Sequence, residues 1–145
     1  MKVQNNVTVQ DQDGNSSKPL LSSRLFKFRA WGTKIKWMSK PFSFGQVLNF
    51  HDQIIKSLTA DEIIMQFTGL KDKNEVDIYE GDIVTYKRSI GNWTGQFMTT
   101  THKIIFTEEV NAFVMEYGSS YIKLRKHWGY EYEVIGNIFE NSELL

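Results

Sequence analysis

The stretch from residue 66 to residue 84, Q-F-T-G-L-K-D-K-N-E-V-D-I-Y-E-G-D-I-V, constrains the fold of this chain more than any other stretch. It begins inside an alternating run in which Ile63, Met65 and Phe67 share one side of an extended chain. A period of two is typical of a half-buried strand. Gly69 is predicted to end that strand, so a β fold is the first expectation.

Two turns are predicted downstream of this strand. Residues 71–75 form a charged run whose Asp72 and Asn74 side chains can bond to their own backbone, which favours an exposed turn. Gly81 marks the second turn, because glycine takes positive φ at no steric cost. Residues 83–87 then leave this turn as another alternating strand.

The central stretch closely resembles the signature of the YopX family of phage and prophage proteins. Two further blocks agree with that family in the same order: K-F-R-A-W at residues 27–31, and E-V-I-G-N-I-F-E-N at residues 133–141 followed by E-L-L at 143–145. The resemblance covers roughly residues 26 to 145. It implies a largely β protein whose C-terminal part is an SH3-like barrel, and it supplies no active residue.

The chain departs from the family pattern at two turns. Asn74-Glu75 stands where the family usually has Asn-Gly. A left-handed Glu75 would cost roughly 1 kcal/mol, unless the bend moves to Asn74. Ser142 replaces a usual proline, and Asn141 is still read as the N-cap of a short helix with Glu143 in its first turn.

A length of 145 residues suits one domain, or two small subdomains that share a core. Residues 1–23 are predicted to be a flexible N-terminal tail, with a short strand at residues 7–9 as the alternative. Residues 24–145 are predicted to be the YopX-like β domain. Within it, residues 24–62 form an N-terminal β hairpin region and residues 63–145 the SH3-like barrel.

Other strands follow from alternation and from glycine turns. Residues 25–31 place Phe26, Phe28 and Ala30 on a candidate core face, and a turn at Gly32-Thr33 leads to a partner strand that places Ile35 and Trp37 together. A second hairpin joins residues 96–106 to residues 111–117. Its core candidates are Ile105, Phe113, Met115 and Tyr117. Residues 121–124 are a short strand and residues 132–135 the closing strand.

The segments between these strands are less regular. Residues 42–50 are aromatic-rich, residues 51–58 fit one or two helical turns, and residues 89–95 are expected to be a mobile loop. A capping-box spacing at residues 59–62 is discounted, because a β-rich run follows at once.

Composition limits the chemistry and the location of the protein. The chain has no cysteine, which excludes disulfides, thiolate zinc sites and thiol nucleophiles. Its first ten residues lack the apolar core of a signal peptide, and its apolar runs are only a few residues long. We therefore expect no membrane partner and a location in the cytoplasm of a bacterial host.

Charge is balanced overall and segregated along the chain. Seventeen basic and seventeen acidic residues give a net charge of zero, so no overall field attracts nucleic acid or membrane. Residues 18–51 contain basic residues without an acidic one, whereas acidic residues dominate residues 61–82. Segments of opposite sign can pair within the chain or with a neighbouring copy.

Catalytic and metal-binding patterns are weak. His51-Asp52 superficially resembles the metal-binding pair of phosphohydrolases, but only His102 and His127 are available as further histidine ligands. The acidic candidates Asp72, Glu80 and Asp82 sit at predicted turns, where capping and solvation explain them. No nucleophile, phosphate-loop or zinc-protease motif occurs. A protein that is not an enzyme and needs no cofactor or metal is the expectation.

Interleaved basic and aromatic residues are the stronger functional signal. One explanation involves no function: Lys and Arg are normal on solvated strand faces, and Trp and Phe are normal in a β core. The functional explanation is a surface for single-stranded DNA or RNA, with cations on phosphates and aromatic faces on bases. Its candidate residues are Lys27, Arg29, Lys34, Lys36, Trp37, Lys123, Arg125, Lys126 and Trp128.

The function predicted from the sequence is a protein-interaction or self-assembly module. Its partner would be a host or phage protein or a second copy of the chain. A nucleic-acid-binding β-barrel module is the alternative.

Overall fold

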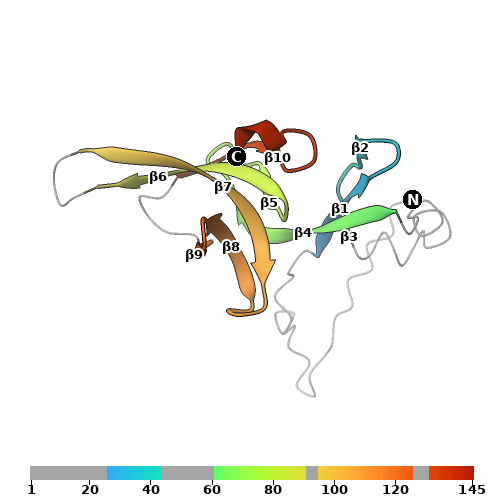
Figure 1. Cartoon of the computed structure of the whole chain (residues 1–145), viewed down its shortest axis with the longest axis horizontal. Coiled ribbons are helices and arrows are strands. Elements are labelled where there is room, and N and C mark those ends of the chain that lie inside the picture. The colour runs from blue at the N-terminus through green and yellow to red at the C-terminus, as the bar shows by residue number, and fades with distance from the viewer. Residues whose placement is uncertain (1–25, 44–60, 91–94, 126–130) are drawn as a thin grey trace, which may run out of the picture.

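The computed structural model describes residues 26–43, 61–90, 95–125 and 131–145 (Figure 1). This part of the chain forms strands and one short 3-10 helix, η1, which confirms the mainly β prediction. The strands and the helix are β1 (Lys27–Gly32), β2 (Trp37–Met38), β3 (Phe42–Ser43), β4 (Glu62–Lys71), β5 (Asp77–Tyr79), β6 (Asp82–Ser89), β7 (Phe97–Thr107), β8 (Ala112–Tyr117), β9 (Ser120–Lys123), β10 (Glu131–Asn137) and η1 (Ser142–Leu144).

The first sheet is built around β1 and β4. Its order is β2-β1-β4-β5, with β3 also paired to β1, and every pair is antiparallel. The β1–β4 ladder runs from Phe28↔Gln66 to Gly32↔Glu62. Strand β4 therefore pairs with the N-terminal hairpin. The predicted division of the chain at residue 62 stays a prediction.

The second sheet has the order β10-β6-β7-β8-β9 and is antiparallel throughout. Strand β7 is long and curved, and it carries the sheet from the β6 hairpin to the β8 hairpin (Figure 1). Both predicted C-terminal hairpin strands and the closing strand are confirmed.

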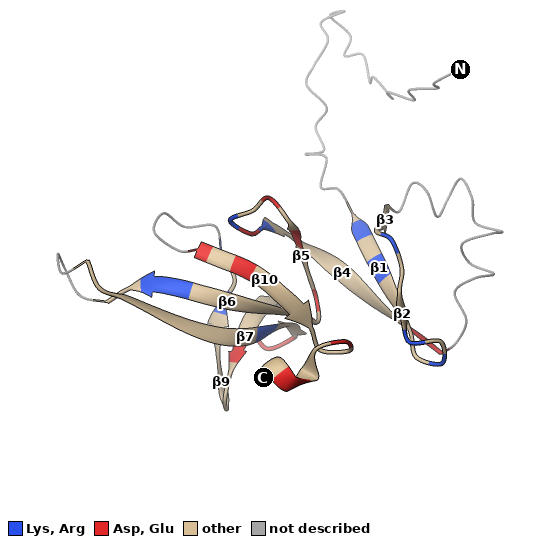
Figure 2. Ribbon diagram, turned by 90° about the horizontal axis from the view of Figure 1, so that it is seen from above, with Lys and Arg blue, Asp and Glu red and all other residues tan. Residues whose placement is uncertain are grey.

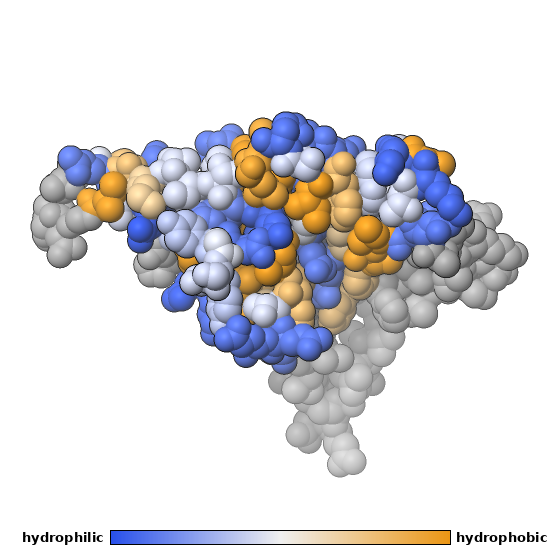
Figure 3. All heavy atoms as spheres, viewed as in Figure 1, coloured by the Kyte–Doolittle hydropathy of each residue, from blue (hydrophilic) through white to orange (hydrophobic). Residues whose placement is uncertain are grey.

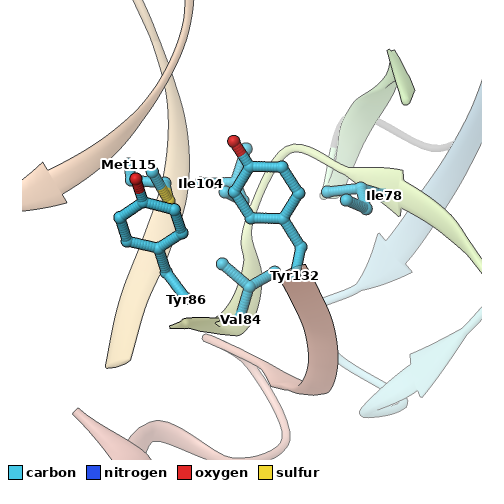
Figure 4. Packing of buried hydrophobic residues seen from close by; sticks show 6 residues of the cluster. All are labelled: Ile78, Val84, Tyr86, Ile104, Met115 and Tyr132. Carbon is cyan, nitrogen blue, oxygen red and sulfur yellow. The ribbon is translucent and has the colours of Figure 1, made fainter. Parts of the chain in front are cut away.

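A buried hydrophobic cluster joins the two sheets. Its members are Ile78, Val84, Tyr86, Ile104, Met115 and Tyr132 (Figure 4). The rings of Tyr86 and Tyr132 stack with centroids 5.6 Å apart. Ile78 belongs to β5 of the first sheet and the other members to the second sheet, so burial of this cluster holds the sheets together.

Strand β4 continues past Gly69, so the predicted strand end is wrong. Gly69 has φ +86°, and the register with β5 shifts between Phe67↔Tyr79 and Lys71↔Asp77. A glycine inside a strand often marks such an irregularity, because it accepts backbone angles that other residues avoid. Glycine here bends the strand instead of ending it.

The turn after β4 differs from the prediction in two ways. Asp72 is only 5% exposed, whereas an exposed turn residue was predicted. Glu75 itself takes φ 64°, so the alternative in which the bend moves to Asn74 is wrong. The second turn is confirmed, with Gly81 at φ +80°.

The candidate core face of β1 is only partly correct. Ala30 is buried, but Phe26 is 55% exposed. Trp31 follows Ala30 and so lies on the opposite face of the strand, yet it is only 4% exposed. Trp31 stacks on Phe139 with ring centroids 5.5 Å apart. Because the face of Trp31 packs against residues that follow β10, both faces of this central strand contribute to burial.

The β1–β2 hairpin forms, but its second strand is shorter than predicted. Ile35 lies in the turn that connects the strands and is 70% exposed, and Trp37 is also exposed. These two side chains therefore do not belong to the hydrophobic core.

The β7–β8 core prediction is partly wrong. Met115 is fully buried, but Tyr117 is exposed, and Ile105 and Phe113 are half-buried. Ile104 and Val114, in adjacent positions on the two strands, are fully buried instead. Exposure rises toward the ends of the hairpin, so position along the strands decides burial as much as the face does.

The predicted C-terminal cap is wrong in its hydrogen bonding. Asn141 makes no side-chain cap bond to η1, which is a single 3-10 turn. Its Oδ1 instead accepts a bond from the backbone N–H of Asn137 at 3.3 Å.

Several predictions lie outside the described residues. They are the N-terminal tail, most of the aromatic and helical segments between β3 and β4, and the centre of the β6–β7 loop. Strand β4 begins at Glu62, which agrees with discounting a helix there. Among the described residues, no helix has the length and apolar character needed to cross a membrane.

Candidate functional site

Three of the residues predicted to contact nucleic acid form ion pairs within the chain. Lys27 and Arg29 on β1 pair with Asp77 and Asp82, and Lys34 in the β1–β2 turn pairs with Asp61. The basic N-terminal segment thus meets the acidic central segment, one of the two outcomes expected from segregated charge. Figure 2 shows the blue bands of β1 and the charged turn beside β5.

Arg29 and Asp82 form the most buried of these pairs. Arg29 Nη2 donates to Asp82 Oδ1 at 2.5 Å, and the two side chains are 13% and 1% exposed. Asp82 Oδ2 also accepts the backbone N–H of Tyr79 at 2.7 Å. Burial raises the pKa of Asp82, while Arg29 and the Tyr79 N–H oppose that increase.

Tyr79 completes this junction. The Arg29 guanidinium carbon lies 4.8 Å from the centroid of the Tyr79 ring, a cation–π distance. Burial, with a further contribution from Asp77, raises the pKa of Tyr79 to about 12. The Tyr79 hydroxyl and Arg29 Nε are buried, and neither has a hydrogen-bond partner among the described residues. The Arg29 and Tyr79 side chains are therefore part of the packed junction between the sheets.

The remaining candidates divide between two distant places. Lys36 and Trp37 are exposed at the β1–β2 hairpin of the first sheet, whereas Lys123 and Arg125 are exposed at and after β9, the edge of the second sheet. Figures 1 and 2 place β2 and β9 far apart. Lys126 and Trp128 lie outside the described residues. The described candidates therefore do not form a single basic surface.

Asp72 is a structural carboxylate. Its Oδ1 accepts the backbone N–H groups of Asn74 at 2.7 Å and Val76 at 2.9 Å, and its Oδ2 accepts the N–H of Val134 in β10 at 3.0 Å. It thus closes its own turn and attaches that turn to the second sheet. Capping explains Asp72, as predicted, but solvation explains neither Asp72 nor Asp82, because both are buried.

The C-terminal block is another network of turn contacts. Asn137 Oδ1 accepts the N–H groups of Phe139 and Glu140, each at 3.0 Å. A Cβ on Gly136 would lie 2.5 Å from Asn141 Oδ1, closer than real contacts allow. Local packing therefore favours glycine at 136, and Asn137 holds the backbone of the turn that follows.

His102 is the one predicted histidine that the structure describes. It is buried, its Nδ1 lies 2.9 Å from the Glu116 carbonyl oxygen and its Nε2 lies 2.7 Å from Thr100 Oγ1. Hydrogen bonds within the chain therefore account for both ring nitrogens of this histidine. His51, Asp52 and His127 lie outside the described residues. No group of three or more potential metal ligands occurs among the residues that are described.

A groove of about 690 Å³ lies between β4 and the β7–β8 hairpin. Its size falls within the range of roughly 300–1,000 Å³ that is usual for binding sites. Its apolar wall consists of Phe26, Phe67, Leu70, Phe106, Phe113 and Leu124. Figure 3 shows hydrophobic atoms reaching the surface above the hydrophilic tip of the hairpin.

One side of this groove is the edge of β4. Residues 66–70 all line it. Because successive side chains of a strand point to opposite faces, five consecutive lining residues indicate that the strand presents its edge. The ladder with β1 ends at Phe28↔Gln66, and no described strand extends it beside Thr68 and Leu70. Phe26, just before β1, lines the same groove.

The opposite side is the start of β8. Asn111, Ala112 and Phe113 line the groove there. The ladder with β9 begins at Val114↔Lys123, so Ala112 lies beyond the described β8–β9 pairing. The groove is therefore bordered by two incompletely paired strand edges and an apolar wall.

Sequence reasoning did not identify this groove. Phe26 and Phe113 were taken as core residues, and Phe106 was not singled out. Their alternation with polar residues indicates strands, but groove formation depends on where each partner strand ends. The only available signal was the number of large apolar residues at predicted strand ends.

The described residues define an antiparallel, two-sheet β protein whose signature residues lie at the junction between the sheets. The family model described as YopX protein matches residues 27–145, and the chain belongs to the YopX family. The resemblance found in the three sequence blocks is thereby confirmed.

A solved structure shares this fold. The chain is similar to protein EF1440 from Enterococcus faecalis, whose crystal structure matches with a TM-score of 0.50 at 26% sequence identity. The match covers 83% of this chain and 98% of that chain. No curated protein matches the chain significantly.

Proposed function

We propose that this chain is a non-enzymatic protein-interaction module that binds an extended segment of polypeptide in the groove between β4 and the β7–β8 hairpin. Phage or prophage origin and action in the cytoplasm of a bacterial host are part of the proposal, as the family resemblance implies. The observation that carries it is the groove itself, bordered on each side by an incompletely paired strand edge.

Strand addition is the recognition mode that this geometry favours. An extended segment that pairs with a sheet edge gains main-chain hydrogen bonds, while alternate side chains enter pockets and give specificity. The aromatic wall provides such contacts, since burial of one large apolar side chain contributes roughly 1.5–3 kcal/mol. Phe106 is 42% exposed and is therefore available to a ligand.

The hydrogen bonds of the buried carboxylates support a binding module without catalysis. Asp72 binds three backbone N–H groups, and Asp82 binds Arg29 and a backbone N–H. Both carboxylates have hydrogen-bond partners within the chain. The assignment of residues 63–145 to an SH3-like barrel belongs to the same proposal.

The test is peptide binding by fluorescence anisotropy. A library of labelled ten-residue peptides with alternating apolar and polar residues is titrated with the full chain. We expect micromolar binding by a subset of peptides and at least a tenfold loss with Phe106→Ser. The matched control is Phe97→Ser, which removes another exposed phenylalanine of β7 that does not line the groove. The absence of any binder, or equal losses in both variants, would overturn the proposal.

Nucleic-acid binding remains the second candidate. Lys36, Lys123 and Arg125 are exposed and form no ion pair with another described residue. Anisotropy against single- and double-stranded DNA and RNA at low and near-physiological salt tests this function, because phosphate contacts weaken steeply with salt. Binding that disappears in the Lys123→Glu/Arg125→Glu variant would support it. No binding at low salt would remove it.

A further inference from the structure

We propose that the groove binds the β1–β2 hairpin, residues 30–39, of a second copy of this chain, so that copies associate head to tail. This inference rests on the proposed function, since it names the polypeptide that the groove binds. The donor surface is the hairpin with its exposed Ile35 and Trp37, and the acceptor surface is the groove between β4 and the β7–β8 hairpin.

The first argument is the apolar surface of the β1–β2 hairpin. Ile35 and Trp37 lie two positions apart, and both side chains are more than half exposed. Exposed apolar side chains that gather in one place commonly mark an interaction site. Tryptophan is also among the residues that contribute most to binding between proteins. The hairpin therefore presents an apolar surface that the described part of the chain does not bury.

The second argument is that hydrogen bonds hold this hairpin in place. Ser39 Oγ accepts the backbone N–H of Ala30 at 2.8 Å, and the Thr33 hydroxyl donates to the carbonyl oxygen of Asp61 at 2.7 Å. The Lys34 ammonium also pairs with the Asp61 carboxylate. A segment that is already ordered loses little conformational freedom when it binds.

The third argument is that both surfaces offer strand edges. Strand β2 is the outermost described strand of the first sheet, and the groove is bordered by incompletely paired edges of β4 and β8. An edge of one copy can therefore add to an edge of the next through main-chain hydrogen bonds. No described residue that lines the groove is charged, so the groove suits the indole of Trp37 better than a charged group.

The fourth argument is charge complementarity at the rim. Lys36 lies between the two apolar residues of the hairpin, and it is exposed without an ion pair to another described residue. The turn between β7 and β8, at one end of the groove, carries the exposed Glu108 and Glu109 and no basic residue. Opposite charges at a rim steer association and fix orientation more than they add affinity. The basic hairpin therefore matches the acidic turn.

The register of the first sheet separates the hairpin from the groove of its own chain. The hairpin turn follows Gly32, which lies opposite Glu62 at the start of β4, whereas residues 66–70 line the groove. The six residues of strand from Glu62 to Thr68 span roughly 20 Å. Figure 1 likewise shows β2 and β8 well apart. The hairpin therefore reaches only the groove of another copy, and such a contact produces rings or filaments.

Sedimentation velocity of the full chain tests the association. We expect the average mass to rise with concentration from the low micromolar to the submillimolar range, and Trp37→Ser to weaken association at least tenfold. The matched control is Phe97→Ser, because Phe97 is as exposed as Trp37 but lies outside the hairpin and the groove. A wild-type chain that stays monomeric, or equal losses in the two variants, would overturn the proposal.

Mixing two variants tests the head-to-tail arrangement. Trp37→Ser keeps an intact groove and Phe106→Ser keeps an intact hairpin, so the two should form a one-to-one pair although each alone is monomeric. Fluorescence anisotropy of labelled Trp37→Ser measures this binding. A Phe106→Ser partner that also carries Trp37→Ser should bind at least tenfold more weakly, whereas one that also carries Phe97→Ser should bind normally. Circular dichroism verifies that every variant folds. Single variants that do not bind each other would overturn the arrangement.

The peptide library separates this inference from the proposed function. The library is titrated against Trp37→Ser, whose groove is intact. Library peptides that bind while the two single variants do not pair would overturn the second copy as the occupant and leave the proposed function standing. Neither peptide binding nor pairing would overturn both.

Discussion

Buried polar side chains hold specific backbone segments in this protein. Asp72, Asp82, Asn137 and His102 are all buried, and each forms hydrogen bonds with backbone groups or neighbouring side chains. A buried polar group without such partners would be costly. The acidic residues at the centre of the sequence therefore have a structural explanation, which is independent of any catalytic one.

The buried ion pair predicts unequal effects of two similar substitutions. Asp82→Asn leaves Arg29 largely buried without its counter-charge, so we expect a loss of about 3–5 kcal/mol in the free energy of unfolding. Asp77→Asn removes the partner of Lys27, where both side chains retain contact with solvent, and should cost about 1 kcal/mol or less. Urea denaturation measures both. Equal losses would contradict the structural role assigned to Asp82.

Tyr79 predicts a pH dependence of stability. Its pKa is raised from 10.0 to about 12, so the folded protein favours the neutral phenol. The resulting stability is fully present below pH 10 and is lost as the pH rises from 10 to about 12. Tyr79→Phe removes this dependence, so the stability of the wild type relative to the variant should fall by about 2–3 kcal/mol across this range.

Urea denaturation of both proteins between pH 8 and pH 12 provides the measurement. At neutral pH the variant should be within about 1 kcal/mol of wild type, because the lost hydroxyl has no hydrogen-bond partner among the described residues. Parallel pH profiles of wild type and variant would show that Tyr79 is not the group responsible.

The turn between β4 and β5 is held by hydrogen bonds within the turn and by contacts with the second sheet. Asp72 closes the turn, and the N–H of Lys73 donates to the carbonyl of Tyr132 in β10 at 2.9 Å. Lys73 also pairs with Glu133 at 2.7 Å, and that hydrogen bond raises the pKa of Lys73. The element is therefore fixed from outside as well as from within, which explains how it tolerates a strained residue.

That strain predicts a stabilising substitution. Glu75 has φ 64°, a conformation that costs most residues about 1 kcal/mol and glycine very little. Glu75→Gly should raise the free energy of unfolding by about 0.5–1 kcal/mol. Glu75→Ala is the matched control, because it loses the same ion pair with Lys71 but keeps the strain. A thermal or urea melt in which alanine stabilises as much as glycine would refute the explanation.

Contacts between the sheets link the described part of the molecule, and we expect it to unfold as one cooperative unit. Arg29 pairs with Asp82, Trp31 stacks on Phe139, and Ile78 of the first sheet packs in the cluster of the second. These contacts come from all three signature blocks of the family. The blocks are therefore far apart in sequence but meet at one junction.

Cooperativity predicts a single unfolding transition. Urea curves from tryptophan fluorescence and from far-ultraviolet circular dichroism should coincide. Phe139→Ala, which removes the half-buried ring stacked on Trp31, should lower the free energy of unfolding by about 1.5–3 kcal/mol without separating the two curves. Two resolved transitions in the wild type would instead show that the sheets unfold independently.

The sequence by itself determined the strands, the turns and the family. Alternation of apolar and polar residues depends only on the local extended conformation, and glycine or asparagine at a turn depends only on the local backbone angles. Strands β4, β6, β7 and β10 were therefore predicted with errors only at their ends. The strand end at Gly69 was misplaced because a neighbouring strand, β5, stabilises the irregular backbone there.

Tertiary structure alone decided which charges are buried and where a groove lies. Arg29 and Asp82 are separated by 53 positions, and only the packing of two sheets brings them together. The groove exists because β1 and β9 end before the strands that they pair with. Pairing between distant segments determines such edges, and no local pattern of residues records it.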